Sequence, residues 1–169
     1  YMPYRWCFKM EKHNIAPVFD RNSRILILGS FPSVKSREAE FFYAHPQNRF
    51  WRVISRLLEC EFPVTAEEKR AMLINSGIAV WDVIESCDIE GSGDSTIKNV
   101  KVNRFDKILK TADIKRIFCN GAASYKLYHK YCEPQTGIGA VKLPSTSPAN
   151  AAFSLERLIR EWKVILEAL

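Results

Sequence analysis

The sequence predicts a three-layer α/β/α domain with a central four-stranded parallel sheet. Two observations support this fold class: four short apolar runs recur along the chain, and segments with helical patterns lie between them. Unbroken apolar runs are typical of strands covered on both faces, and strands that alternate with helices form parallel sheets. Ligands of such domains gather at the carboxyl ends of the strands, so we expect functional residues directly after the apolar runs.

The first strand is the clearest of the four. Residues 25–28 read ILIL, a continuous apolar run that stops at Gly29. The run is short and consists of aliphatic residues, as expected for a strand buried on both faces. The other three strands are expected at Ile78 to Val83, Arg116 to Cys119 and Ala140 to Leu143.

Helix-start signals define the elements between the strands. Asn48 is a favourable N-cap for a helix that runs to Leu58, and Thr65 with Glu68 forms a capping box before a second helix. An amphipathic pattern begins after Ser154 and continues to the C-terminus. The four helical segments expected are residues 48–58, 66–75, 122–131 and 154–169.

The length of 169 residues favours one domain with a single core. Residues 1–23 lack clear periodicity, and we interpret them as an irregular N-terminal arm that precedes a single domain over residues 24–169. Residues 90–95, rich in Gly, Ser and Asp, are interpreted as a connecting loop.

Composition narrows the classes of function. A net charge of +6 favours a polyanionic partner through a general electrostatic attraction. No apolar run approaches the length of a membrane span, which predicts an intracellular protein, cytoplasmic in a prokaryote. Five widely spaced cysteines without a CxxC pair argue against a disulfide framework, a zinc site or an iron–sulfur cluster. They are Cys7, Cys60, Cys87, Cys119 and Cys132.

Two longer segments and one short one carry the chemistry. The first is GSFPS at residues 29–33, followed by FYAHPQNRFW at residues 42–51, and the second is LPSTSPANA at residues 143–151. Together with WDV at residues 81–83, they resemble the hypoxanthine-DNA glycosylase family of the uracil-DNA glycosylase superfamily. The resemblance extends from about Phe19 to the C-terminus and makes residues 24–169 a single glycosylase domain.

The resemblance implies an activity. It is hydrolysis of the N-glycosidic bond of deaminated bases in DNA, chiefly hypoxanthine (deoxyinosine), in base excision repair. We expect a monomer that needs no metal and no cofactor. Apart from Lys35, no lysine lies in or just after a signature loop to act as a Schiff-base nucleophile, so we expect hydrolysis without strand cleavage.

A glycosylase of this kind needs a pocket for a base that has left the helical stack. Gly29 permits close backbone approach and Pro32 stiffens the turn, although a tight strand-to-helix turn is the structural alternative. Tyr43 resembles the aromatic residue that stacks on the extruded base in mismatch-specific relatives, but a core or surface aromatic is the alternative. The expected base-pocket residues are Gly29, Ser30, Phe31, Pro32, Ser33, Tyr43, His45 and Asn120.

Asn48 and Asp82 are the catalytic candidates. Phe31 stands where many relatives carry the Asp or Asn that positions water, so the resemblance implies that another residue compensates. Asn48 would orient water and stabilise charge through its amide, unless it serves only as a helix cap. Asp82, at a strand end, would meet the base edge or support the developing sugar cation, unless it caps a helix or forms an ion pair.

The second signature loop is expected to contact DNA. Its hydroxyl and amide groups suit phosphate, although a Ser/Pro-rich turn before the last helix is the structural alternative. Ser145 stands where several relatives carry a catalytic His, and Ala149-Asn150 offers no large apolar wedge. The expected DNA-binding residues are Ser145, Thr146, Ser147, Pro148, Ala149 and Asn150.

Three other functions fit the same residues. The first is a glycosylase for uracil or xanthine, since the fold and loops would serve several deaminated bases. The second is a catalytically inactive module that binds DNA lesions, suggested by the residues at positions 31 and 145. The third is an α/β enzyme that acts on free nucleosides and ignores DNA.

Overall fold

The computed structural model describes residues 10–13 and 15–169, and its centre is the predicted four-stranded parallel sheet. The strands lie in the order β3-β2-β6-β7, and each pairs in parallel with its neighbours. Their bounds are β2 Ile25–Gly29, β3 Ile78–Asp82, β6 Arg116–Asn120 and β7 Ala140–Leu143. All four predicted strands are therefore present, with ends shifted by no more than one residue.

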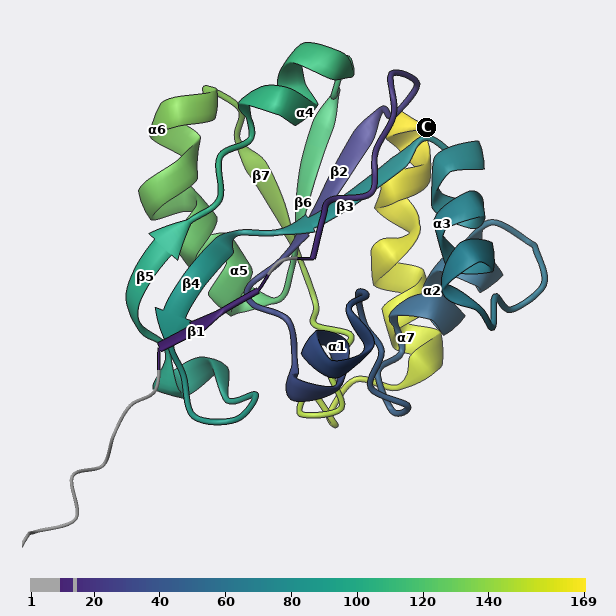
Figure 1. The fold of residues 1–169 in the computed structure, drawn as a ribbon. Helices are drawn as coiled ribbons and strands as arrows, with labels where there is room; N and C mark the ends of the chain where they lie inside the picture. The colour runs from purple at the N-terminus through teal and green to yellow at the C-terminus, as the bar shows by residue number, and fades with distance from the viewer. Residues whose placement is uncertain (1–9, 14) are drawn as a thin grey trace, which may run out of the picture.

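Helices cover both faces of this sheet and make three layers (Figure 1). Helices α2, α3 and α7 lie on one side, while α4, α5 and α6 lie on the other. Their bounds are α2 Phe50–Leu57, α3 Ala66–Asn75, α4 Asp106–Thr111, α5 Ala122–Leu127, α6 Glu133–Thr136 and α7 Leu155–Trp162. A short helix, α1 Val34–Ala39, follows β2 at the edge of the sheet.

The side chains of β2 explain why the sheet needs two helical layers. Ile25 and Ile27 belong to the core cluster beneath α2, α3 and α7, whereas Leu26 and Leu28 belong to the cluster on the opposite face. All four side chains are fully buried. A strand with apolar side chains on one face and polar side chains on the other could pack against only one of the two helical layers.

The helix-start signals hold with one correction. Thr65 accepts a hydrogen bond from the Glu68 N–H, and Ser154 accepts one from the Arg157 N–H, as capping residues do. Asn48, however, is not the N-cap of α2, because that position belongs to Arg49. The helix expected over residues 122–131 is longer than predicted: α5 continues through a π-helical segment, Tyr128–Cys132, into α6.

A second, smaller sheet was not predicted. It is antiparallel, with strand order β1-β4-β5, and packs beside the main sheet. Its strands are β1 Met10–Lys12, β4 Ile84–Asp88 and β5 Lys98–Val102. Strand β4 begins only two residues after β3 ends, so the chain passes directly from the parallel sheet into the antiparallel one.

The N-terminal arm is therefore not irregular throughout. Besides β1, Val18 is fully buried and exchanges two backbone hydrogen bonds with Val80 of β3, at 3.0 and 2.9 Å. The described part of residues 1–23 packs on the domain instead of extending from it. Cys7 lies outside the described residues; of the other cysteines, Cys60 is exposed, while Cys87, Cys119 and Cys132 are buried thiols.

Candidate active site

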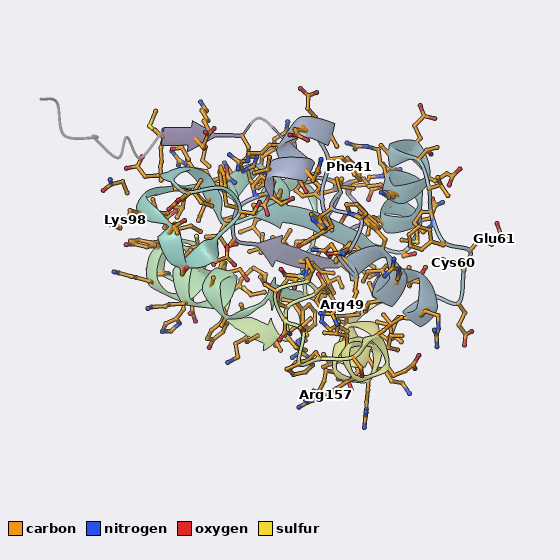
Figure 2. The ribbon with its side chains drawn as sticks, turned by 90° about the horizontal axis from the view of Figure 1, so that it is seen from below. Phe41, Arg49, Cys60, Glu61, Lys98 and Arg157 are labelled. Carbon is orange, nitrogen blue, oxygen red and sulfur yellow. The ribbon has the colours of Figure 1, made fainter. Side chains whose placement is uncertain are left out.

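A pocket of about 310 Å³ opens at the carboxyl ends of the parallel strands, where such domains bind their ligands. Figure 2 looks onto this edge of the molecule. Of the predicted site residues, Asn150 alone does not line the pocket; it lines an adjoining depression instead. Those that line it are Gly29, Ser30, Phe31, Pro32, Ser33, Tyr43, His45, Asn48, Asp82, Asn120, Ser145, Thr146, Ser147, Pro148 and Ala149.

The pocket floor lies where β2 and β3 end together. Gly29 pairs directly with Asp82 in the sheet register. A Cβ atom at position 29 would lie only 2.5 Å from Asp82 Oδ1 and 3.2 Å from the Tyr43 hydroxyl oxygen. Glycine is therefore required at this position because two polar groups occupy the space of a side chain.

Asp82 is a buried carboxyl group, only 3% exposed. Its Oδ2 atom has no hydrogen-bond partner among the described residues. Burial raises the pKa of Asp82 to about 7, and the charge of Asp94 acts in the same direction. No helix starts at Asp82, and no described cation pairs with it, so neither structural alternative explains this side chain.

Tyr43 combines a packing role with a place in the pocket. Its backbone is held in the left-handed region at φ 51°, and its ring stacks on Phe50 at a centroid distance of 4.0 Å. The hydroxyl group is buried without a hydrogen-bond partner among the described residues. Burial raises the pKa of this hydroxyl, so it stays protonated and available as a donor at the pocket floor.

Asn48 ties the two signature segments together. Its Oδ1 atom accepts hydrogen bonds from the Phe50 N–H at 2.9 Å and from the Thr146 hydroxyl at 2.8 Å. The Phe50 contact fixes the orientation of the amide, because only the oxygen can accept from a backbone N–H. No described residue accepts from Asn48 Nδ2, so the amide N–H groups are the part of Asn48 available to a ligand.

Asn120 supports this arrangement from the end of β6. Its side chain both donates to Thr146 Oγ1 and accepts from the Thr146 N–H, each at 3.0 Å. Thr146 is fully buried, and it is the hydroxyl that then donates to Asn48. Asn120 and Thr146 thus hold the loop after β7 against Asn48, and their polar atoms are engaged with one another.

Ser33 and His45 have mainly local structural roles. The Ser33 hydroxyl caps α1 by accepting from the Ser36 N–H, and His45 Nδ1 accepts from the Gln47 N–H at 3.1 Å. Both line the pocket, but these contacts belong to a helix cap and to a local turn, which are structural roles. Phe31 packs edge-on against the His13 ring at 5.3 Å and brings no polar group into the pocket.

Arg49 was missed by the sequence analysis. Its guanidinium donates to the backbone oxygens of Phe153, of Ser147 at 3.1 Å and of Asn150 at 3.0 Å. Its backbone N–H donates to the Thr146 oxygen at 3.0 Å. Figure 2 shows Arg49 beside the loop that precedes α7. An arginine directly after Asn48 was the available signal, but nothing in the sequence reveals its partners about a hundred residues away.

The Gly/Ser/Asp loop after β4 forms a wall of the pocket, which the sequence analysis also missed. The Ser30 hydroxyl donates to Asp94 Oδ1 at 2.8 Å, and Asp94 and Ser92 both line the pocket. The loop is anchored because Ser92 Oγ accepts from the Val34 N–H at 2.9 Å and Arg37 donates to the Gly91 oxygen at 2.8 Å. An acidic residue in a polar loop after a strand was the only signal.

Among the described residues, no group of three or more His, Cys, Asp or Glu side chains could hold a metal ion. No helix of the described chain is long and apolar enough to cross a membrane.

Comparison with known proteins identifies the family to which this fold and this site belong. The chain belongs to the uracil DNA glycosylase superfamily, whose family model matches residues 16–167. It is 33% identical over 160 residues to the hypoxanthine DNA glycosylase of Methanosarcina acetivorans, and the matched region covers 92% of this chain and 98% of that protein. The identity to the Methanosarcina barkeri hypoxanthine DNA glycosylase is 32% over 117 residues, or 68% and 74% of the two chains.

A solved structure supports the fold directly. The solution NMR structure of a Methanosarcina acetivorans protein described as a uracil DNA glycosylase has a TM-score of 0.79 to this chain. The two sequences are 31% identical, and the match covers 93% of this chain and 96% of the other. These comparisons confirm the family and the fold that the sequence predicted.

Proposed function

We propose that this protein is a monofunctional DNA glycosylase that releases deaminated bases, chiefly hypoxanthine, from DNA in base excision repair. The observation that carries the proposal is the pocket at the sheet edge, whose floor holds two buried polar atoms with no hydrogen-bond partner in the part of the chain that the structure describes, Asp82 Oδ2 and the Tyr43 hydroxyl. The names of the relatives of similar length point to the same substrate. An extruded base brings its own donors and acceptors, which would satisfy both groups.

Asp82 has the properties of an acid that assists base departure. When the C1′–N bond breaks, the base takes the bonding electrons and needs a proton. A carboxyl group with a pKa of about 7 retains its proton over part of the neutral range and can donate it. Asp82 and the Tyr43 hydroxyl would contact the base edge from the pocket floor.

Asn48 is proposed to act through its amide N–H groups. Because Oδ1 is committed to Phe50 and Thr146, Asn48 would donate hydrogen bonds to a water molecule or to the departing base. A preorganised donor of this kind stabilises negative charge that develops in the transition state. This role differs from deprotonation of water, which an amide cannot perform.

Hydrolysis without strand cleavage fits the placement of the lysines. None of the described residues that line the pocket is a lysine. Lys35, the lysine nearest to the first signature in sequence, is exposed and pairs with Glu38 at 3.7 Å. The product would therefore be a free base and an intact strand with an abasic site.

DNA would bind across the loop after β7. Pro148 and Ala149 are exposed at its tip, and its hydroxyl and amide groups suit phosphate contacts. The net charge of +6 favours the same partner. We propose that the protein binds DNA as a monomer.

A panel of oligonucleotides tests this proposal. Each carries one hypoxanthine, uracil, xanthine or ethenoadenine, and base release is measured under single-turnover conditions. We expect the fastest release with hypoxanthine. Faster release of uracil or xanthine would reassign the substrate within the same activity, whereas hydrolysis of free inosine without release from DNA would overturn the proposal.

A further inference from the structure

The proposed reaction requires a negative charge near the deoxyribose, which neither the Asn48 amide nor a protonated Asp82 supplies. As the C1′–N bond breaks, positive charge develops on the deoxyribose, and a water molecule must be held where it can attack C1′. An ionised carboxylate serves both purposes in glycosidic bond hydrolysis. The segment after β2 offers none, because Ser30, Phe31 and Pro32 carry no carboxyl group.

The structure brings a carboxylate to this segment from elsewhere. Asp94 lies in the loop between β4 and β5, yet its Oδ1 atom accepts the Ser30 hydroxyl hydrogen bond across 64 positions of sequence. A hydrogen bond fixes the orientation of the carboxyl group, and the loop itself is anchored to Val34 and Arg37. No described side chain donates a hydrogen bond to Asp94 Oδ2, and Asp94 lines the pocket.

The place of Asp94 in the wall of the pocket suits a contact with the sugar. Asp82 marks the floor, where the base would lie, and the loop at residues 145–150 marks the outer surface, where phosphates would lie. The deoxyribose joins base to phosphate, so it must lie between them. Asp94 is exposed at the pocket mouth and lines both the pocket and the adjoining depression that Asn150 lines.

The two carboxyl groups have different environments, which suits them to different tasks. Asp82 is almost completely buried, and burial favours its neutral form. The surrounding protein also raises the pKa of Asp94 above its ordinary value, although Asp94 is exposed at the pocket mouth, and the Ser30 hydrogen bond, which favours the ionised form, opposes that rise without reversing it. In many enzymes, two carboxyl groups in different environments divide the work, so that one donates a proton and the other stays ionised.

We propose that Asp94 is a further catalytic residue of this glycosylase, one that holds the attacking water and stabilises the positive charge on the deoxyribose. The inference rests on the proposed function. The C1′–N bond breaks with its electrons leaving on the base, which takes a proton. The water oxygen bonds to C1′ and passes one proton to the Asp94 carboxylate, which releases it to solvent.

Asp94→Asn tests the inference, because it removes the charge and keeps an oxygen that can accept from Ser30. Asp94 is exposed, so the variant is expected to fold normally. We expect single-turnover base release to fall roughly a hundredfold to a thousandfold, with DNA affinity unchanged. The fall is expected to be the same for hypoxanthine and uracil, since both bases leave the same sugar. Asp113→Asn is the matched control. Asp113 is also an exposed carboxylate, but it pairs with Lys115 just before the amino end of β6, at the opposite edge of the sheet from the pocket.

A pH profile provides a second readout. The wild-type rate is expected to fall on the acid side as Asp94 is protonated, and Asp94→Asn is expected to lose that limb. If Asp94→Asn releases base at the wild-type rate from oligonucleotides that the wild type cleaves, Asp94 has no catalytic role, although the proposed function stands. A defect confined to one base would also overturn the inference and assign Asp94 to base reading. A wild type that releases no base from any oligonucleotide would refute the proposed function, and this inference with it.

Discussion

Asp82 is the residue whose environment departs furthest from that of an ordinary surface carboxyl group. It is buried, its Oδ2 lacks a partner among the described residues, and Gly29 leaves room for Oδ1 to approach the backbone. Ionising such a group costs free energy, because burial removes the water that would solvate its charge. The protein thus maintains at this position a group that lowers stability, which is typical of functional sites.

The cost at Asp82 predicts a pH dependence of stability. The pKa is 3.8 without the fold and about 7 within it, so the folded state holds a proton that the unfolded state has lost between those values. Stability contributed by this group therefore falls as pH rises from about 4 to about 7 and is constant above that range. Each pKa unit corresponds to about 1.4 kcal/mol, so the total loss is at most about 4 kcal/mol.

Asp82→Asn is expected to remove this loss. The free energy of unfolding of Asp82→Asn minus that of the wild type should increase with pH across the same range, as measured by urea unfolding at several pH values. Asp106→Asn, which changes an exposed carboxylate paired with Arg104, serves as the control and should show no such trend. A difference between Asp82→Asn and the wild type that is independent of pH would contradict the account of Asp82.

Asn48 allows its structural and chemical roles to be separated. Asn48→Asp keeps an acceptor for Phe50 and Thr146 but loses the amide N–H groups, whereas Asn48→Ala loses both. We expect both variants to lose roughly a hundredfold to a thousandfold in single-turnover base release, with only Asn48→Ala melting at a lower temperature. Near-wild-type release by Asn48→Asp would assign Asn48 to packing alone.

At the scale of elements, the sequence predicted the strands and helix caps that depend on residues close together in the chain. The four parallel strands were predictable because short, largely apolar runs followed by polar or turn residues are typical of buried strands. The caps at Thr65 and Ser154 were predictable because they act within one helical turn. Strands β1, β4 and β5 were missed because they mix polar with apolar residues and show no continuous apolar run. Their formation depends on pairing between distant segments, which no local pattern shows.

The residues of the site also fall into those that local sequence predicts and those that depend on distant partners. Residues of the signature segments were predictable because the resemblance lies in contiguous stretches that follow strands. Arg49 and Asp94 were not, because each is defined by a partner far away in sequence: Asn150 is about a hundred residues from Arg49, and Ser30 is 64 from Asp94. A polar loop and an arginine beside a helix have too many ordinary uses for sequence alone to single them out.

The loop before α7 gives a prediction at the element scale. Arg49→Lys keeps the charge but cannot span three carbonyl oxygens as a guanidinium does. We expect DNA affinity to fall roughly tenfold, because lost hydrogen bonds to a charged donor cost about 1.5 to 3 kcal/mol and leave the loop less ordered. The slope of log Kd against log salt should not change, since Arg49 donates to the protein and not to phosphate.

Arg157→Lys is the control for this prediction. Arg157 lies in the first turn of α7 and stacks over the Phe153 ring at 4.0 Å, and its guanidinium donates to none of the described carbonyl oxygens of the loop. Its replacement should leave affinity within about twofold of the wild type, since an exposed cation contributes little by itself. Equal losses in both variants would show that Arg49 does not act by holding the loop.

At the scale of the whole molecule, charge should govern encounter with DNA. A net charge of +6 and a polar loop at the pocket mouth predict phosphate contacts, which release counterions on binding. Between about 50 and 200 mM salt, we expect affinity for a lesion-containing duplex to fall roughly tenfold or more, as for neutralisation of about two phosphates. Fluorescence anisotropy would measure this, and affinity that stays flat across the range would exclude phosphate contacts as the main source of binding.

The most direct test of the whole account is to identify the products of one turnover. A duplex with a single deoxyinosine is mixed with excess enzyme in the presence of a chelator, and the free base and the DNA strand are both analysed by mass spectrometry. We predict one equivalent of free hypoxanthine and an unbroken strand that carries an abasic site. Tight binding of the duplex with no base released would contradict the account and identify the protein as a lesion-binding module.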